Sequence, residues 1–404
     1  MGIRMRRFLL IVGVILVALV LVVRLTLGGG RLMEDRTGPP ELPGSVLEKV
    51  VDLDYPPGNI AVHKPSGRVF FTLHPDADPP HHLMTIRDGK AEPYRPKIMP
   101  PLETPLGMRM RRDWLWVLDH GNFGRGQPRI VAFDVTTDAL VHQYKFPPEV
   151  AGFGSMLNDL VVDGSGENVY ITEASPIFHR PAIVAYNARL RAARRVLDGH
   201  PSVMPENYRL RVDGRDMTLL GGLITLRIGA DSITTDGTDV FYGPVNGGTL
   251  YKVIMTEMSP DSGIPAADIA GMVEEYGPKP NSDGLITDPA GNIYITDPEH
   301  SAILVLDKEK KLRTLVKDER LRWPDGLAFG PDGYLYVTCS ALQHVLFRSA
   351  ENIRAHAPYQ IYRFKPGLTE FPPPPGTEPA PAPAAAPVPE AQPEPAPTPG
   401  TPGR

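Results

Sequence analysis

The sequence predicts an all-β fold, a six-bladed β-propeller carried between an N-terminal transmembrane helix and a disordered proline-rich tail. Three observations support this fold class: a two-strand motif recurs along the chain, each copy opens on a polar residue, and both ends differ in composition from the middle. The 404 residues are 42% hydrophobic and 22% charged, which is ordinary for a globular chain and excludes wholesale disorder. The length would fit two or three domains, but an all-β propeller of this size commonly forms one.

A hydrophobic segment lies near the start of the chain. Residues 8–27 are apolar or small apart from Arg24 and are long enough to cross a bilayer as a helix. Three arginines precede the segment, so the positive-inside rule leaves the N-terminus in the cytoplasm and the body on the periplasmic or extracellular side. A cleaved signal peptide, which would make the protein secreted, is the alternative. We therefore expect residues 1–30 to form a signal anchor and residues 31–44, rich in Gly and Pro, to form a linker.

The two-strand motif recurs through residues 45–371, the predicted propeller. Clear copies lie at residues 59–72, 158–172, 231–242, 283–296 and 325–338, and a weaker copy lies around residues 111–119. Each copy has a polar residue, an apolar strand, a turn, and a β-branched or aromatic strand, which is the pattern of a β-hairpin. Two further strand-like runs follow most copies. Four strands per repeat, at spacings of 42 residues from Asp283 to Asp325 and 52 from Asp231 to Asp283, indicate propeller blades.

The last repeat lacks its fourth strand, because only residues 359–364 follow its hairpin before the prolines begin. Residues 46–53 precede the first copy, and we predict that they complete the last blade and pair its exposed edge. An insertion rich in Arg and Asp fills residues 198–228, and loops of that length are usually functional or flexible. Residues 372–404 are rich in Pro and Ala and cannot form a core, so we expect an extended tail that contacts cell-envelope components or partners.

The polar residues that open the repeats are expected to be neighbours, because a propeller gathers the starts of its inner strands around the channel mouth. They are Asn59, Asn158, Asp159, Asp231, Asp283 and Asp325. Crowded carboxylates raise one another's pKa unless a cation or a basic ligand neutralises them. The cluster therefore predicts a ligand-binding site on the axis. The alternative is that these residues only cap strand ends and turns.

A second set of histidines and acidic residues follows the hairpins. It comprises His74, Asp119, His120, Glu173, Asp297, Glu299, His300, Cys339 and His344. A histidine beside a carboxylate can act as a general acid–base pair near neutral pH, and Asp297 with His300 belongs to the densest cluster. The catalytic candidates are therefore Asp283, Asp297 and His300 if the protein is an enzyme, and a solvated charge cluster is the alternative.

Several function classes are excluded. The formal net charge of −5 argues against nucleic-acid binding. The single Cys339 excludes an internal disulfide and a thiolate metal cluster. The sequence has no nucleophile elbow, zinc-protease helix motif or phosphate-binding loop. The oxygen ligands that remain suit Ca²⁺ or another divalent cation.

Four parts of the chain carry a resemblance to a known family. They are residues 56–62, residues 157–162 with 169–172, residues 231–244 and residues 282–285. Together these segments resemble the major royal jelly protein/Yellow family in its bacterial form. The resemblance implies an exported six-bladed propeller; insect members promote dopachrome rearrangement or bind biogenic amines in the axial cavity. For this chain it implies a small polar, cationic or aromatic ligand, with dopachrome-tautomerase-like isomerase activity if it is an enzyme.

A more distant resemblance is to the six-bladed, metal-dependent gluconolactonase/senescence marker protein/luciferin-regenerating enzyme family. By position, Asn158 matches the substrate-binding Asn of that family, Asp231 stands at its metal-binding Asn, and Asp283 matches its metal-binding Asp. Asn59 stands where that family has a metal-binding glutamate, which is a departure from the pattern. The resemblance implies, as an alternative, a lactonase with a divalent metal at Asn158, Asp231 and Asp283. A non-catalytic scaffold is the third alternative.

Overall fold

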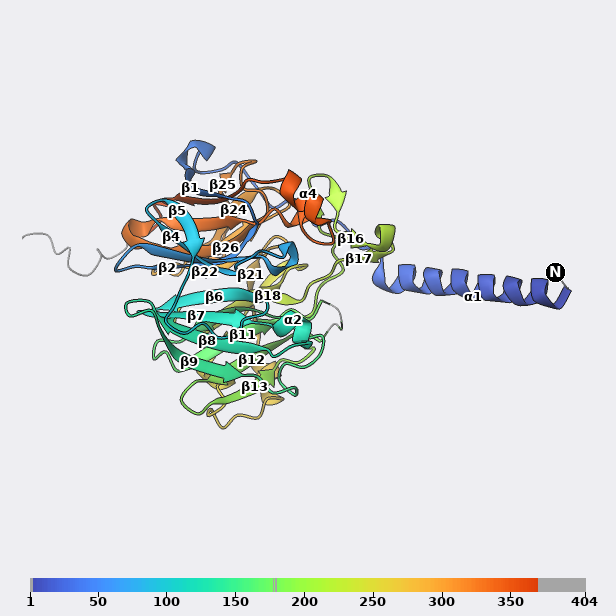
Figure 1. Cartoon of the computed structure of the whole chain (residues 1–404), viewed down its shortest axis with the longest axis horizontal. Coiled ribbons are helices and arrows are strands. Elements are labelled where there is room, and N and C mark those ends of the chain that lie inside the picture. Colours follow the sequence, from blue (N-terminus) through green and yellow to red (C-terminus); the bar gives the residue numbers. More distant parts are fainter. Residues whose placement is uncertain (1–2, 177, 179, 370–404) are drawn as a thin grey trace, which may run out of the picture.

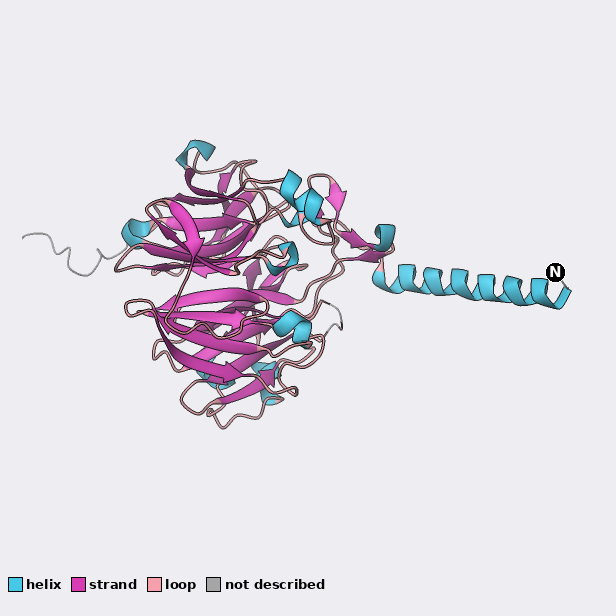
Figure 2. Cartoon of the chain, viewed as in Figure 1, coloured by secondary structure: helices cyan, strands magenta, loops and turns pink. Residues whose placement is uncertain are grey.

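Six four-stranded antiparallel sheets form the body of the computed structural model, which describes residues 3–369 apart from 177 and 179 (Figures 1 and 2). The innermost strands of neighbouring sheets contact each other around a closed ring, in the order β2, β6, β10, β18, β22, β26 and back to β2. The predicted six-bladed β-propeller is therefore confirmed. The predicted tail, residues 372–404, lies outside the described residues.

Blades 1 to 5 each consist of four strands that follow one another in the chain, from the axis outward. Blade 1 contains β2 (Pro57–His63), β3 (Arg68–Leu73), β4 (Leu83–Arg87) and β5 (Lys90–Pro93), and blade 2 contains β6 (Pro105–Arg111), β7 (Trp114–Asp119), β8 (Arg129–Asp134) and β9 (Ala139–Lys145). Blade 3 contains β10 (Leu157–Val162), β11 (Asn168–Glu173), β12 (Ala182–Asn187) and β13 (Ala192–Val196). Blade 4 contains β18 (Ala230–Thr235), β19 (Asp239–Pro244), β20 (Thr249–Ile254) and β21 (Glu274–Pro278), and blade 5 contains β22 (Leu285–Thr287), β23 (Ile293–Asp297), β24 (Ala302–Leu306) and β25 (Leu312–Lys317).

Blade 6 combines the two ends of the propeller sequence. Its inner strands are β26 (Pro324–Phe329), β27 (Leu335–Cys339) and β28 (Tyr359–Phe364), and its outer strand is β1 (Glu48–Leu53). β1 runs antiparallel to β28 with Glu48 opposite Arg363 and Leu53 opposite Tyr359. The predicted closure by an N-terminal strand is therefore confirmed, and it removes the open edge that blade 6 would otherwise present.

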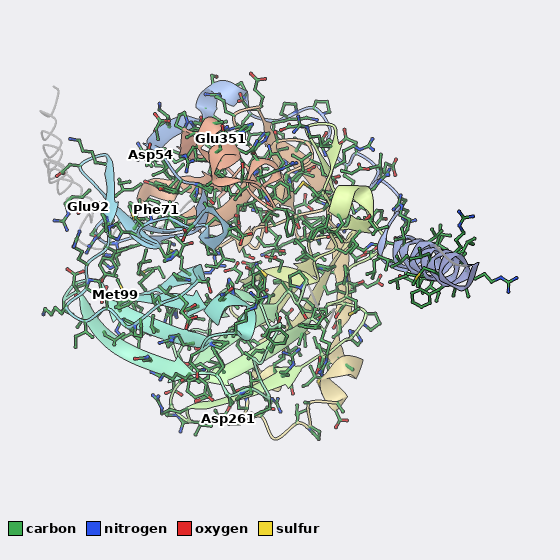
Figure 3. All side chains as sticks on the ribbon, turned by 45° about the vertical axis from the view of Figure 1, so that its right-hand side comes forward. Asp54, Phe71, Glu92, Met99, Asp261 and Glu351 are labelled. Atoms are coloured by element: carbon green, nitrogen blue, oxygen red, sulfur yellow. The ribbon has the colours of Figure 1, made fainter. Side chains whose placement is uncertain are left out.

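The hydrophobic core is divided among the seams between blades. Each of six clusters of buried side chains joins two neighbouring blades. Phe71 lies inside the body, whereas Glu92, Met99 and Asp261 lie at its outer edge (Figure 3). Burial of one such phenylalanine stabilises the fold by about 1.5–3 kcal/mol. Seams of this kind make every blade depend on both of its neighbours.

Buried threonines tie neighbouring inner strands together. The Thr72 hydroxyl accepts a hydrogen bond from the Asn59 amide at 3.0 Å and donates to the Leu106 carbonyl of blade 2 at 2.9 Å. The Thr338 hydroxyl accepts from the Gly326 amide at 2.8 Å and donates to the Gly58 carbonyl of blade 1 at 2.6 Å. Thr338 therefore links the last blade to the first at the point where the ring closes.

We expect Thr338→Val to lower the free energy of unfolding by about 1–3 kcal/mol, because a buried amide and a buried carbonyl lose their partner while the volume is kept. Urea denaturation of the full chain measures the loss. Thr238→Val is the matched control, since Thr238 is exposed, and it should be neutral. Equal stability of the two variants would contradict this role of Thr338.

Helix α1 (Ile3–Leu27) projects from the side of the propeller that carries β16 (Thr218–Leu219), β17 (Ile224–Thr225) and α4 (Ala350–Ala355) (Figure 1). Residues 5–27 are long and apolar enough to cross a membrane, and a signal sequence near an N-terminus passes the same test. The predicted insertion forms two small hairpins, β14 (Arg211–Val212) with β15 (Arg215–Asp216) and β16 (Thr218–Leu219) with β17 (Ile224–Thr225). Two short helices, α2 (Gly121–Gly124) and α3 (Met255–Met258), lie between strands of blade 2 and of blade 4.

The segment that the sequence predicts as a linker is held along the propeller. The backbone amides of Glu41 and Leu42 donate to the carbonyls of Thr314 and Leu315 at 3.0 and 2.8 Å. Arg36 donates to two carbonyls, those of Gly248 and Lys279, at 2.6 Å each. Hydrogen bonds to blades 4 and 5 therefore fix the path of the chain from α1 to the first blade.

Candidate functional site

A cavity of about 640 Å³ opens at the axis, at the end where the inner strands begin. Its described lining includes every polar residue predicted to bind ligand: Asn59, Asn158, Asp159, Asp231, Asp283 and Asp325. The structure therefore brings these residues together from five blades. Five blades contribute at one or both of two adjacent positions at the start of the inner strand, which is why a repeat in the sequence becomes a ring in space.

Irregular pairing at the start of the inner strands aims these side chains toward the axis. The strand register shifts between Pro57 and Ile60 in blade 1, and equivalent shifts occur in blades 3, 4 and 6. Asn59 and four of its counterparts lie within these shifts, whereas Asp283 precedes Leu285, the first residue of β22. A bulge leaves a residue unpaired and turns its side chain, so the polar residues face the cavity instead of following the strict alternation of a strand.

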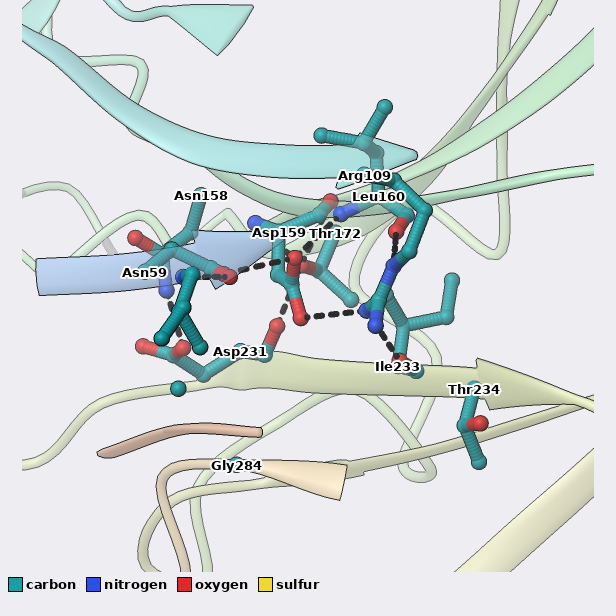
Figure 4. A network of polar contacts seen from close by, with 12 residues as sticks. Asn59, Arg109, Asn158, Asp159, Leu160, Thr172, Asp231, Ile233, Thr234 and Gly284 are labelled. Atoms are coloured by element: carbon teal, nitrogen blue, oxygen red, sulfur yellow. Dashed lines mark hydrogen bonds and ion pairs between the residues drawn. The ribbon is translucent and has the colours of Figure 1, made fainter. Parts of the chain in front are cut away.

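Asp159 and Arg109 form the centre of a polar network (Figure 4). Arg109 Nη2 lies 3.2 Å from Asp159 Oδ2, and Arg109 Nε donates to the Leu160 carbonyl at 2.9 Å. Asn59 Nδ2 donates to Asp159 Oδ1 at 2.9 Å. Burial raises the pKa of Asp159, and Arg109 opposes that rise. This carboxylate therefore has a cationic partner within the protein.

The other three carboxylates have no such partner among the described residues. Asp231 accepts from the Asn158 side-chain amide, and Asp283 Oδ2 accepts from Trp323 Nε1 at 2.5 Å. Burial, reinforced by the neighbouring carboxylates, raises the pKa of Asp231 and of Asp325 well above the usual value. Burial also raises the pKa of Asp283 to about 6. The carboxyl groups at the base of the cavity therefore either carry negative charge close together or hold the protons that neutralise it.

Lys279 lies behind these carboxylates without neutralising them directly. Its Nζ atom is buried and donates to the Pro244 carbonyl at 2.6 Å, the Pro280 carbonyl at 3.1 Å and Ser282 Oγ at 3.1 Å. Burial lowers the pKa of Lys279 to about 7. Because its donors are directed at neutral oxygens, the lysine supports the strand ends and leaves the cavity face of the carboxylates open.

The upper part of the cavity is largely apolar. The insertion and the loop after β27 form much of this wall, through Leu219, Ile224, Leu226, Ile228, Leu342, Val345, Leu346 and Phe347. His74 and His120 also line the mouth. Burial lowers the pKa of His74 and lowers that of His120 to about 4, so both rings are neutral near pH 7. The cavity thus combines an acidic base with an apolar wall.

The acidic residues that end the hairpins mostly organise loops. Glu173 accepts from the backbone amides of Met156 and Ser175 at 2.7 and 3.1 Å. Asp119 accepts from those of Glu103, Thr104 and Gly121, each at 2.9 Å. For these two carboxylates the structure shows the loop-capping role rather than a position in the cavity.

Asp297 and His300 form a close pair that is not among the described residues lining the cavity. Asp297 Oδ2 lies 2.8 Å from His300 Nδ1, and this hydrogen bond raises the pKa of His300. His300 Nε2 lies 3.5 Å from Asp35 of the segment after α1.

Of the other predicted members of the hairpin-end set, Glu299 accepts a hydrogen bond from the Asn281 side-chain amide at 2.7 Å, Cys339 is a buried free thiol, and His344 stacks on His356. The catalytic candidates are thus split, with Asp283 in the cavity and the pair outside it.

Three important residues of the site escaped the sequence reasoning. Arg109 lies in the weakest copy of the repeat, which has Leu106 and Gly107 at the two positions where other blades carry Asn or Asp. In the sequence it is marked just by being a charged residue within a largely apolar strand. Trp323 directly precedes β26, and Lys279 lies in a loop between two prolines. An isolated charged or aromatic residue in such places gives no repeat pattern to follow.

The closed ring of blades and the axial carboxylates define a six-bladed propeller with a cavity suited to a small molecule. Within that class the chain belongs to the major royal jelly protein family, whose model matches residues 111–361, more than half of the sequence. No curated protein sequence matches the chain significantly.

Two solved structures illustrate the likeness of fold. A gluconolactonase from Xanthomonas campestris shares 11% identity with a TM-score of 0.51, over 84% of this chain and 98% of the other. A luciferin-regenerating enzyme shares 12% identity with a TM-score of 0.50, over 80% of this chain and 96% of the other. Identities this low show a common fold and carry no statement about activity.

Proposed function

We propose that this protein is a membrane-tethered receptor for a small organic cation with an aromatic or apolar body. The cation would lie against Asp231, Asp283 and Asp325, and its body against the apolar wall. The family to which the chain belongs supports the choice of propeller cavity, and α1 supports the tether.

One observation carries the proposal: three carboxylates, of which Asp231 is buried and Asp283 and Asp325 are partly buried, share a cavity and form no ion pair with a described residue. Buried charges are normally paired, because an unpaired charge pays a large desolvation cost. A bound cation would supply the missing partner. The volume of about 640 Å³ lies within the range of small-molecule pockets.

An isomerase activity would use the same carboxylates. The pKa of Asp283, about 6, suits a general base near neutral pH. Asp283 would accept a proton from a carbon of the activated ring, and a second protonated carboxyl, such as Asp231, would return a proton to another position of the ligand. The ligand would then change isomer without net uptake or loss of protons.

Calorimetry with the full chain in detergent tests the binding proposal. The probes are aromatic amines, their uncharged isosteres and the matching carboxylic acids, all at pH 8. We expect the amines alone to bind, because only they carry a charge that can replace the missing ion pairs. Equal affinity for the uncharged isosteres would contradict the proposal.

A divalent-metal-dependent lactonase is the second candidate, and one atom favours it. Asn158 Oδ1 is buried, lines the cavity region beside Asp231, and has no hydrogen-bond partner in the described structure. Together with Asp231 and Asp283 it offers an all-oxygen set that suits Ca²⁺. No group of three His, Cys, Asp or Glu side chains placed to share an ion occurs among the described residues, so the asparagine oxygen is needed. A bound cation would polarise a lactone carbonyl.

Metal analysis of the purified chain, followed by assays on a panel of lactones, separates the two candidates. The lactonase proposal expects stoichiometric metal that is lost in Asn158→Ala, and lactone hydrolysis that chelators abolish. A metal-free protein that stays inert with added Ca²⁺ would eliminate it and leave the organic-cation proposal intact.

A further inference from the structure

The end of α1 is attached to the rim of the axial cavity. Leu27, its last residue, lines the cavity. The Gly29 carbonyl accepts from Thr225 Oγ1 of β17 at 2.7 Å, and the Gly28 carbonyl accepts from Arg227 at 3.2 Å. Arg31 pairs with Tyr208 of the insertion through the backbone and through a side-chain hydrogen bond of 2.8 Å. The hydrophobic segment of α1 therefore stops at the level of the cavity mouth.

Exposed apolar side chains surround this mouth. We call four of them the apolar rim: Phe153, Phe178, Leu220 and Phe347, with exposed fractions of 69%, 50%, 74% and 65%. Phe347 lines the cavity itself, and Leu220 lies in the turn between β16 and β17, beside α1. Phe153 packs on Phe178 with ring centroids 5.4 Å apart, and its neighbour Gly154 donates to the Phe123 carbonyl at the mouth. Such a concentration of exposed apolar groups marks an interaction surface.

The charged residues of the mouth favour an anionic partner. Arg125 and Arg348 line the mouth, are exposed, and form no ion pair with a described residue. Asp76 is the exposed acidic residue among the described lining. Aromatic side chains and arginines together are typical of surfaces that lie at the boundary of lipid headgroups and acyl chains.

We propose that the apolar rim is seated in the surface of the same bilayer that α1 crosses, so that the axial cavity opens onto the lipid headgroups. This inference rests on the proposed membrane tether. The helix is attached beside the mouth and projects from the side of the propeller that carries β16 and β17 (Figure 1), so an inserted α1 holds the rim at the membrane surface. The ligand would then reach the acidic base of the cavity from the bilayer, head first, as a cationic amphiphile.

Site-directed spin labelling of the full chain in liposomes containing anionic lipid tests this arrangement. The native Cys339 is buried, and burial raises the pKa of its thiol to about 12, so it should not compete for label. Labels are placed through Phe153→Cys and Leu220→Cys on the rim, and through Met99→Cys at the outer edge of the propeller away from α1 as the matched control. Leu16→Cys within α1 reports membrane insertion.

Molecular oxygen concentrates in the bilayer, whereas a water-soluble nickel chelate stays in the water, and each speeds the relaxation of a spin label that it collides with. The ratio of the oxygen effect to the chelate effect therefore measures how deep the label lies in the bilayer. We expect the ratio at both rim sites to exceed that at Met99 severalfold and to approach that at Leu16. A bilayer-like ratio at Leu16 with water-like ratios at the rim would overturn the inference while leaving the tether intact. A water-like ratio at Leu16 would refute the tether itself. Rim sites protected from both reagents would show that a second copy, and not lipid, covers the rim.

Discussion

Asp283→Asn is expected to stabilise the ligand-free protein above pH 7 and to abolish the binding of organic cations. Both effects have one cause, the charge that Asp283 carries at the base of the cavity. The pKa of Asp283 is about 6 in the folded protein and about 3.9 in an unfolded chain. The folded state therefore holds its proton over a pH range in which the unfolded state has released it.

The sign of the pH dependence follows from linkage. For a carboxyl whose pKa is raised by folding, the favourable contribution is complete below about pH 4, decreases as the pH rises, and is lost above about pH 6. For Asp283 this loss is on the order of 3 kcal/mol. The asparagine side chain that replaces it cannot ionise, so between pH 5 and pH 8 the variant should lose about 1.4 kcal/mol less stability than the unsubstituted protein does. The pKa values of Asp231 and Asp325 are also raised, so both proteins share the rest of the pH dependence. Chemical denaturation at both pH values measures this difference.

Glu309→Gln is the matched control for Asp283→Asn, since Glu309 is an exposed carboxylate. It should change neither the pH dependence nor ligand binding. Destabilisation by Asp283→Asn at pH 8 would mean that the fold stabilises the ionised Asp283 carboxylate. The proposal that this carboxylate lowers stability and is retained for cation binding would then be wrong.

Arg109→Met is expected to lower the free energy of unfolding by about 3–5 kcal/mol, because it leaves the buried Asp159 carboxylate without its cationic partner. The variant also removes donors from the carbonyls of Leu160 and Ile233 in blades 3 and 4. The guanidinium thus connects three neighbouring inner strands, as Figure 4 shows. Urea denaturation of the full chain measures the loss.

A second substitution distinguishes the ion pair from simple packing. Asp159→Asn in the Arg109→Met background should recover part of the lost stability, because the unpaired charge disappears. Arg95→Met, at an exposed position, should be neutral. If the double variant were no more stable than Arg109→Met alone, the cost would lie in the lost carbonyl contacts and not in the buried charge.

The repeat in the sequence was sufficient to predict the blades, the closure by residues 46–53 and the gathering of the six polar residues. Each of these follows from a local pattern that propeller geometry repeats around the axis. The pattern does not reveal partners from distant segments, such as Arg109 for Asp159 or Trp323 for Asp283. It also could not show that the insertion closes one side of the cavity and receives the end of α1, because that placement depends on hydrogen bonds to backbone groups nearly two hundred residues away in the chain.

The position of the hairpin-end pair outside the cavity was hidden for a related reason. In the sequence, Asp297 beside His300 resembles Asp231 or Asp283, since each is an acidic residue at one terminus of a strand. The structure distinguishes these residues by the hydrogen bonds that their carboxylates accept. Asp297 is satisfied by the backbone amides of Glu299 and His300, both at 3.1 Å, and by the His300 ring. The axial carboxylates lack such a set of backbone donors and face the cavity instead.

The most direct test of the central claim, that the axial carboxylates bind an organic cation, is calorimetry of one aromatic amine with the full chain at pH 5 and pH 8. The amine stays protonated at both values, so a change in affinity reports the protein. The pKa of Asp283 near 6 predicts about tenfold tighter binding at pH 8, with protons released on binding at pH 5, and no detectable binding to Asp283→Asn at either pH. Affinity that is independent of pH, or unchanged in the variant, would contradict the proposed site.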